Sequence, residues 1–271
     1  MSRHQRHFER LHQPQAQMAA QQSGSTLIWP FGAIEQHGPQ LPLVTDALFA
    51  DQILNAVLDR LPVEYPVWRL PTQTIGFSPE HGDFPGTLSL PAELLIQMIG
   101  SVGSQMASMG FRRLVLFNAH GGQIALLQVA ARQLRRHVPS MAVLPCFLWS
   151  GVQGLSSLVS DEELNHGLHA GQAETSLMLH LAPDLVGSAR PRDGMPDAMA
   201  TSPPPGWSLE GAAPTAWLTS DLSETGVIGD SRASSDTLGK ALAERLIEHW
   251  YDLLTALLSS DWPGTSRGPA S

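Results

Sequence analysis

Three side chains that can bind a metal ion lie close together in residues 29–46, a segment rich in proline and glycine. Glu35 and His37 are two residues apart, so in an extended backbone both side chains point to the same side. Asp46 follows nine residues after His37, and Pro39 and Pro42 restrict the backbone between them. The alternative is an ordinary surface loop in which Asp46 only caps the next helix. Because such a segment cannot continue a strand or helix, we expect a loop that carries chemistry.

A fourth candidate is a histidine in a glycine-rich turn. Residues 114–117 are continuously apolar, which is typical of a buried parallel strand. His120 follows this run and precedes Gly121-Gly122. A phosphate-binding glycine turn is the alternative, but the segment has no lysine and few glycines. Because the carboxyl ends of parallel strands meet at one edge of a sheet, we expect His120 near Glu35 and His37.

A fifth candidate is a carboxylate on the apolar face of a helix. The helix expected from about Gly171 to Pro183 places Glu174, Met178 and Leu181 on one face. An ionised carboxylate that points into a core is costly unless it is paired or binds a metal. Glu174 is therefore expected to be a metal ligand.

The five candidates offer only oxygen and nitrogen atoms, which favours Zn, Mn or Fe(II). They exceed what one catalytic metal needs, whereas two ions that share a carboxylate would use all of them. Two such ions can hold a hydroxide between them and polarise a carbonyl oxygen. We therefore expect two divalent metal ions per chain and metal-assisted hydrolysis, most naturally of a C–N bond. The ligands would be Glu35, His37, Asp46, His120 and Glu174.

The apolar pattern predicts the elements that must position these side chains. Strands are expected at residues 27–29, 67–71, 111–117 and 141–149, and helices at 47–61, 91–109, 124–137, 171–182 and 234–258. Strands that alternate with helices indicate an α/β fold. Residues 183–226, rich in proline and glycine, are expected to be an irregular excursion that acts as a lid or a subunit contact.

Composition limits the class of protein. The chain has 271 residues, 42% of them hydrophobic, which suits a sizeable core. Its net charge of −9 argues against nucleic acid or an anionic membrane as the main partner. A single cysteine, Cys146, excludes an internal disulfide and a thiolate metal cluster. The sequence lacks an apolar run of about eighteen residues and the apolar stretch of a signal peptide, so we expect a cytoplasmic protein.

Several motifs resemble those of the creatininase (creatinine amidohydrolase) family. The first is Gly32-Ala33-Ile34-Glu35-Gln36-His37-Gly38-Pro39-Gln40-Leu41-Pro42-Leu43-Val44-Thr45-Asp46. The others follow in the family's order: Glu80-His81, Phe84-Pro85-Gly86-Thr87, Asn118-Ala119-His120-Gly121-Gly122, His169-Ala170-Gly171-Gln172-Ala173-Glu174-Thr175-Ser176 and Gly226-Val227-Ile228-Gly229-Asp230. Together they cover roughly residues 26–245.

The resemblance implies a three-layer α/β/α fold with a mostly parallel central sheet, and a homo-oligomer that is often a hexamer. It also implies a two-metal hydrolase in which Asp46 bridges the ions. We expect a mobile tail or frayed helix over residues 1–24, a single metallohydrolase domain over 25–260 and a disordered tail over 261–271.

The resemblance also implies roles beyond metal binding. His169 matches a histidine that handles protons for the ring nitrogen in creatininase itself, so His169 and Glu174 are the expected catalytic residues. Residues expected to contact a small-molecule amide substrate are His81, Gly121 and Trp149. From its place in a turn-rich loop, the pair Glu80-His81 is expected at the rim of the site or just behind its ligands, with a direct catalytic role as the alternative.

Three positions depart from creatininase itself. Gly122 stands where that enzyme has an acidic metal ligand, and Leu168 where it has another acid. Asn165 stands where it has a tryptophan over its substrate. We therefore expect Glu174 to supply the missing ligand, and the metal centre to carry over better than creatinine specificity.

The expected function is hydrolysis of a non-peptide C–N bond in a small amide, formamide or lactam, by attack of a metal-bridging hydroxide. Three alternatives stay within the enzyme class: conversion of creatinine to creatine, formamidopyrimidine-type deformylation, and peptide trimming in cofactor maturation. A non-catalytic binding protein on the same fold is the alternative outside it.

Overall fold

The centre of the molecule is a sheet of four parallel strands in the order β2-β1-β3-β4. The computed structural model describes residues 6–196 and 203–264. The strands are β1 (Thr26–Phe31), β2 (Val67–Arg69), β3 (Arg113–Asn118) and β4 (Ala142–Phe147). β1 and β3 are buried along their whole length, as expected for apolar strands covered on both faces.

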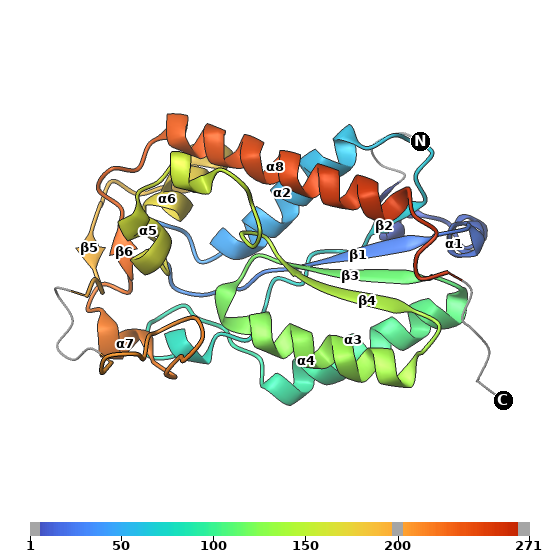
Figure 1. Cartoon of the computed structure of the whole chain (residues 1–271), viewed down its shortest axis with the longest axis horizontal. Coiled ribbons are helices and arrows are strands. Elements are labelled where there is room, and N and C mark those ends of the chain that lie inside the picture. The colour runs from blue at the N-terminus through green and yellow to red at the C-terminus, as the bar shows by residue number, and fades with distance from the viewer. Residues whose placement is uncertain (1–5, 197–202, 265–271) are drawn as a thin grey trace.

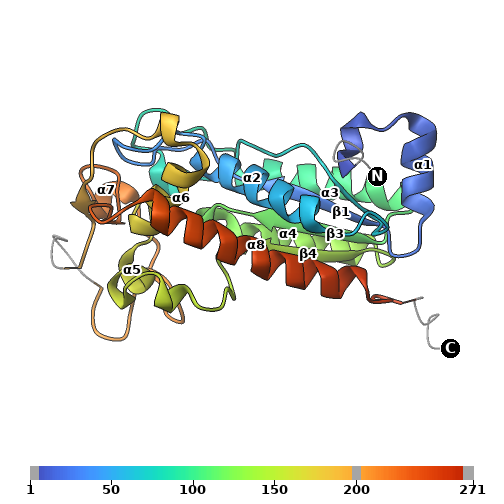
Figure 2. The ribbon, with the colours of Figure 1, turned by 90° about the horizontal axis from the view of Figure 1, so that it is seen from above.

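Helices cover both faces of the sheet and produce three layers (Figures 1 and 2). On one face lie α2 (Thr45–Arg60) and α8 (Asp236–Leu258), and on the other α3 (Ala92–Met109) and α4 (Ile124–His137). Alternate residues of β1 supply the two cores: Ile28 packs on the α2 and α8 side, and Leu27 and Trp29 on the α3 and α4 side. The expected three-layer α/β fold with a parallel sheet is confirmed.

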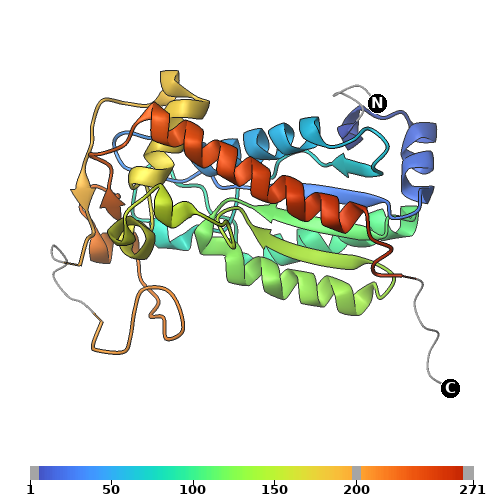
Figure 3. The same ribbon diagram turned by 45° about the horizontal axis from the view of Figure 1, so that its top comes forward.

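The smaller elements gather beyond the carboxyl ends of the strands (Figures 1 and 3). They are α5 (Asp161–His166), α6 (Gln172–Leu181), β5 (Arg192–Asp193), α7 (Thr219–Leu222) and β6 (Gly229–Asp230). β5 and β6 pair antiparallel in a separate two-stranded sheet. Residues 183–196 and 203–226 are mostly irregular, as the sequence predicts, and residues 197–202 lie outside the described part of the chain.

The amino-terminal segment is packed onto the body. The sequence predicts a mobile tail or a frayed helix before residue 25; the structure has a 3₁₀ turn at Phe8–Arg10 and then α1 (Gln13–Gln21). Ala19 and Ala20 of α1 are buried, and the ring of Phe8 packs against Phe111 with centroids 5.8 Å apart. Residues 1–5 of this expected tail, and residues 265–271 of the expected carboxyl-terminal tail, lie outside the described residues.

Two expectations about single residues have clear outcomes. Asp46 does not cap α2: the helix begins at Thr45, its N-cap residue is Val44, and Asp46 is a buried side chain in the first turn. Pro145 in the strand expected at 141–149 predicts an edge strand or an irregularity, and β4 is at the edge of the sheet. Among the described residues, no helix combines the length and apolar character needed to cross a bilayer.

The contact between α6 and α8 fixes the helix that carries Glu174. The two helices meet at Gly239, where an added Cβ would lie 1.8 Å from the carbonyl oxygen of Ser176. The hydroxyl of Ser176 also accepts a hydrogen bond from the backbone N–H of Ser235, at 3.1 Å. A side chain at position 239 would therefore push α6 away from α8.

We expect Gly239→Ala to lower the free energy of unfolding by about 1–3 kcal/mol, the usual cost of overpacking. Gly100→Ala is the matched control, because a Cβ at this position of α3 would meet no atom within 4 Å apart from the neighbouring backbone of its own helix. This control should raise the free energy by about 0.5–1 kcal/mol through helix propensity. Urea unfolding of both variants measures the difference, and equal effects would contradict the packing described here.

Candidate functional site

The loop after β1 and the first turn of α2 bring two carboxylates and a histidine together. Glu35, His37 and Asp46 are all buried. The Nε2 atom of His37 lies 3.4 Å from Oδ1 of Asp46 and 3.9 Å from Oε1 of Glu35. The Nδ1 atom of His37 is 3.1 Å from the carbonyl oxygen of Glu35, which can only accept, so the proton of a neutral ring is on Nδ1. The lone pair of Nε2 therefore faces the carboxylates.

The turn after β3 adds a second histidine to the same cluster. Nδ1 of His120 lies 3.3 Å from Oε1 of Glu35 and 3.2 Å from Oδ2 of Asp46. Its Nε2 donates to the carbonyl oxygen of Phe77 at 2.9 Å. The side chain of Asn118 bonds both the N–H and the carbonyl of His120 and so fixes its backbone. As with His37, the lone pair is turned toward the carboxylates.

Glu174 reaches the cluster from the first turn of α6. Its Oε2 accepts a hydrogen bond from the backbone N–H of Ala170 at 2.7 Å. The structure therefore brings all five predicted ligands together. Three groups of side chains have ligand atoms within 4.8 Å of one another: Glu35 with Asp46 and His120, His37 with Asp46 and Glu174, and Glu35 with His37 and His169.

Several polar atoms at the centre of the cluster are buried without a hydrogen-bond partner. They are both carboxylate oxygens of Glu35, Oδ2 of Asp46 and Nε2 of His37. Unpaired polar atoms of this kind are costly to bury. Carboxylate oxygens and imidazole nitrogens are the ligands that Zn, Mn and Fe(II) accept, so the residues present fit divalent metal ions.

The charges of the cluster shift the pKa values of its members. Burial would lower the pKa of His37, but the carboxylates of Asp46, Glu35 and Glu174 outweigh it and raise this pKa to about 9. The pKa of His120 is likewise raised well above its usual value, despite burial, by Glu35 and Asp46. Burial raises the pKa of Glu174 to about 7. The carboxylates thus require positive charge beside them, supplied by protons or by metal ions.

His169 is inside the cluster but is oriented differently. Its Nε2 donates to the carbonyl oxygen of Gln36 at 2.7 Å, so the lone pair is on Nδ1, 3.8 Å from Oε1 of Glu35. Burial, and then the charges of His37 and His81, lower the pKa of His169 well below its usual value. At neutral pH this ring is therefore an uncharged proton acceptor.

His81 also lies within the cluster, more deeply than the sequence suggests. Its Nε2 is 3.4 Å from Oε1 of Glu35, and its ring stacks on that of His169 with centroids 4.1 Å apart. Burial, which outweighs the nearby carboxylates, lowers its pKa to about 4. A Glu-His pair in a turn-rich loop is a weak signal, because its sequence position does not show which way the histidine points.

Glu80 occupies the space beside Gly122. A Cβ at position 122 would lie 1.6 Å from Oε1 of Glu80, and the same oxygen is 3.5 Å from Nε2 of His120. The glycine therefore admits a carboxylate that comes from a different loop. The sequence places Glu80 at the rim of the site or just behind its ligands, and no local pattern indicates that its carboxylate fills the space beside residue 122.

Gly121 and Trp149, which the sequence also predicts to contact the substrate, differ in how deeply they are buried. Gly121 is exposed and begins a 3₁₀ turn at the end of β3. Trp149 follows β4, and its ring meets that of Phe49 edge-on with centroids 6.3 Å apart. Trp149 is partly buried and packs against the core on the α2 side of the sheet.

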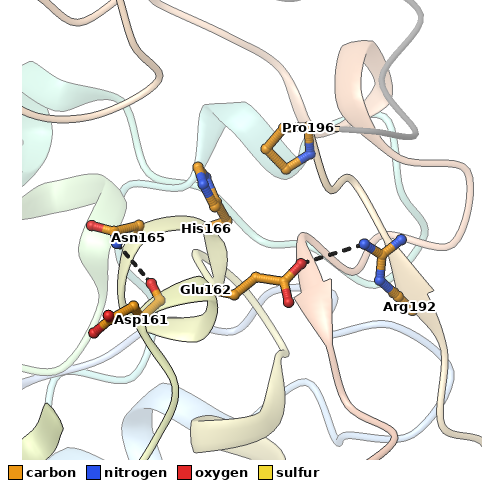
Figure 4. Close-up of a pocket in the computed structure, with 6 residues that line it drawn as sticks. All are labelled: Asp161, Glu162, Asn165, His166, Arg192 and Pro196. Atoms are coloured by element: carbon orange, nitrogen blue, oxygen red, sulfur yellow. Dashed lines mark hydrogen bonds and ion pairs between the residues drawn. The ribbon is translucent and has the colours of Figure 1, made fainter.

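A cavity of about 470 Å³ lies beside α5 (Figure 4). Glu162 pairs there with Arg192 at 3.4 Å, and Asn165 donates to the backbone carbonyl of Asp161 in its own helix. None of its lining residues belongs to the groups of candidate ligands, so the chemistry is assigned to the buried cluster. The lining residues are Asp161, Glu162, Asn165, His166, Arg192 and Pro196.

Comparisons with known proteins show the fold and the family. A chain of known structure, described as creatininase with Mn, has a TM-score of 0.72 at 22% identity, over 92% of this chain and 97% of that one. A mutant creatininase described as the Zn-Zn type has a TM-score of 0.71 at 24% identity, over 92% of this chain and 97% of that one. Likeness at this level of identity concerns the fold.

Two curated relatives are similar in sequence. The mycofactocin precursor peptide peptidase of Mycobacterium tuberculosis (strain ATCC 25618 / H37Rv) is 31% identical over 229 residues, which are 82% of each chain. The creatinine amidohydrolase of Pseudomonas putida is 31% identical over 192 residues, which are 66% of this chain and 71% of the relative.

The family model matches nearly the whole described body of the protein. It is described as Creatininase: Creatinine amidohydrolase, and it spans residues 9–254. This match covers β1 to β4 and every predicted ligand, and it confirms the resemblance seen in the motifs. The chain therefore belongs to the creatininase family.

Proposed function

We propose that this protein is a metal-dependent hydrolase of an amide C–N bond. One observation carries the proposal: buried atoms of Glu35, His37 and Asp46 lack hydrogen-bond partners, and ligand atoms of His120 and Glu174 meet them within groups no wider than 4.8 Å. Members of the creatininase family are hydrolases, and the relatives' names, amidohydrolase and peptidase, both denote cleavage of amide bonds.

Glu35, Asp46 and His120 would hold one ion, and His37, Asp46 and Glu174 would hold a second, since Asp46 belongs to both groups. The proximity of ligand atoms within each group supports this division. Bound there, two divalent ions would polarise the amide carbonyl and lower the pKa of a water molecule. The Mn and Zn forms named for solved creatininases support either metal.

The chain itself handles the protons. His169 presents the lone pair of Nδ1 to the interior of the site, because its Nε2 proton is bonded to the carbonyl oxygen of Gln36. In hydrolysis, Nδ1 takes the proton that the attacking water loses as its oxygen bonds the carbonyl carbon. The same atom then gives this proton to the leaving nitrogen as the C–N bond breaks.

A peptide amide is the substrate class to test first, because the relative with the larger shared coverage is named a peptide peptidase. This ranking differs from the small amide expected from the motifs alone. Creatinine is the second class, supported by the Pseudomonas putida relative. The residues Gly122, Leu168 and Asn165 count against creatinine, since the resemblance of the motifs implies two acids and a tryptophan at these positions in creatininase itself.

We expect Asp46→Asn to abolish tight binding of both ions, because Asp46 is common to both assigned groups. Metal affinity should fall by more than about 100-fold, since loss of an outer hydrogen-bond partner alone costs about 10–100-fold. Chelator competition followed by metal analysis measures this. The control is Asp59→Asn at the exposed end of α2. Retention of two tightly bound ions by the Asp46 variant would contradict the assignment.

Glu174→Gln should reduce the bound metal from two ions per chain to one, because Glu174 belongs to one assigned group only. Glu163→Gln is a matched control. Like Glu174, Glu163 accepts a backbone N–H, that of Ala173 at 2.8 Å; it is buried but belongs to no ligand group among the described residues. If both variants keep two ions, the assignment of Glu174 is wrong.

His169→Asn should keep both ions and lower kcat by about 10²–10⁴-fold, the usual contribution of general acid–base catalysis. The measurement is hydrolysis of a panel of short peptides, formamides and creatinine by the metal-loaded protein, with metal analysis alongside. Loss of an ion from this variant would make His169 a ligand instead. An inactive wild-type protein with two bound ions would favour a binding function.

A further inference from the structure

Gln36 lies between the two histidines that are not assigned as ligands. Its backbone carbonyl accepts the Nε2 proton of His169 at 2.7 Å. Its side-chain Nε2 is 2.9 Å from Nδ1 of His81. Gln36 is itself buried, with 5% of its surface exposed, so water does not replace these contacts. One residue thus touches one nitrogen of each ring.

The orientation of the Gln36 amide is fixed by two backbone groups. Its Oε1 accepts the N–H of Gly38 at 2.9 Å, and its Nε2 donates to the carbonyl oxygen of Gly226 at 2.9 Å. A flipped amide would place oxygen against oxygen and N–H against N–H, so only one assignment satisfies both partners. The second Nε2 proton then points at Nδ1 of His81.

This orientation decides which nitrogen of His81 carries a proton. Nδ1 must accept from the amide of Gln36, and the hydroxyl of Thr219, 2.7 Å from the same atom, can also donate. The proton of the neutral ring is therefore on Nε2, which is 3.4 Å from Oε1 of Glu35. His169 has the opposite arrangement toward the same oxygen, with a lone pair on Nδ1 at 3.8 Å.

We propose that Gln36 is a positioning residue that holds His81 and His169 in the same Nε2–H tautomer but turned opposite ways, so that His81 offers an N–H donor to the site and His169 a lone pair. The inference rests on the proposed amide hydrolysis. His169 handles the transferred proton, and the Nε2–H of His81 donates a hydrogen bond to the carbonyl oxygen of the substrate as negative charge builds up there. A protonated Nε2 also means that His81 is not a ligand through this atom.

Gln36→Glu tests the proposal by replacing the donor with an acceptor of the same shape. The carboxylate would draw the proton of His81 to Nδ1 and leave a lone pair on Nε2. In zinc-loaded protein with ¹⁵N-labelled histidine, the two ring nitrogens of His81 should exchange their protonated and unprotonated chemical shifts. His81→Asn identifies these signals by their loss. With two ions bound, kcat should fall by about 10²–10³-fold, as for loss of one donor to a developing oxyanion.

Gln40→Glu is the control for a new charge in the same loop. Gln40 is also buried, and its amide donates to the carbonyl oxygen of Ala170 and to Thr175, not to a histidine ring. This variant should leave the signals of His81 unchanged. If Gln36→Glu does not fold, the wild-type spectrum still decides the tautomer. A proton on Nδ1 of His81 in that spectrum, or exchanged tautomers with unchanged kcat, would overturn the inference.

Different results would contradict the proposed amide hydrolysis and the proposed role of Gln36. The tautomers are read from the zinc-loaded protein without turnover, so absence of amide hydrolysis would remove the proposed function and leave the tautomer assignment intact. Hydrolysis of an amide by a wild-type protein with its His81 proton on Nδ1 would remove only the role of Gln36.

Discussion

Mutual repulsion among buried carboxylates is the constraint on which this structure depends. Buried Glu35 and Asp46 meet the partly buried Glu174 where little water can screen them, and such an arrangement is stable only with positive charge between them. The backbone supplies the geometry: main-chain carbonyls hold one nitrogen of His37, His120 and His169. Each ring therefore turns its other nitrogen inward without needing a side-chain partner. His81 is held by an amide donor instead, and so it offers a proton.

The sequence predicts the parts of this site that are local. Glu35 and His120 follow apolar runs, and residues after parallel strands emerge at one edge of a sheet, so their meeting follows from the pattern alone. Glu174 is predicted by the cost of an inward carboxylate. The helix pattern also predicts α2, α3, α4 and α8 to within a few residues.

The parts that the sequence does not predict depend on contacts between distant segments. The place of His81 is set by Thr219, 138 residues away, and that of Gln36 by Gly226, 190 residues away. A single sequence carries no periodic signal for such pairs. The sequence also does not predict that α1 packs onto the body. This helix is polar and glutamine-rich, and the side chains that it buries are small alanines.

These distant contacts also bear on the irregular segment before β6. Asp193 accepts bonds from the backbone N–H groups of Glu224 and Thr225 and so holds the turn that leads to Gly226. The same turn bonds Gln36, and α7 bonds His81, so this segment is attached to the site at two points. The sequence leaves two roles open for this segment, a lid and a subunit contact. Because these bonds attach the segment to the site, they favour the role of a lid. A segment that helps to hold the histidines would form a wall of the site, and changes in it would then alter chemistry as well as access.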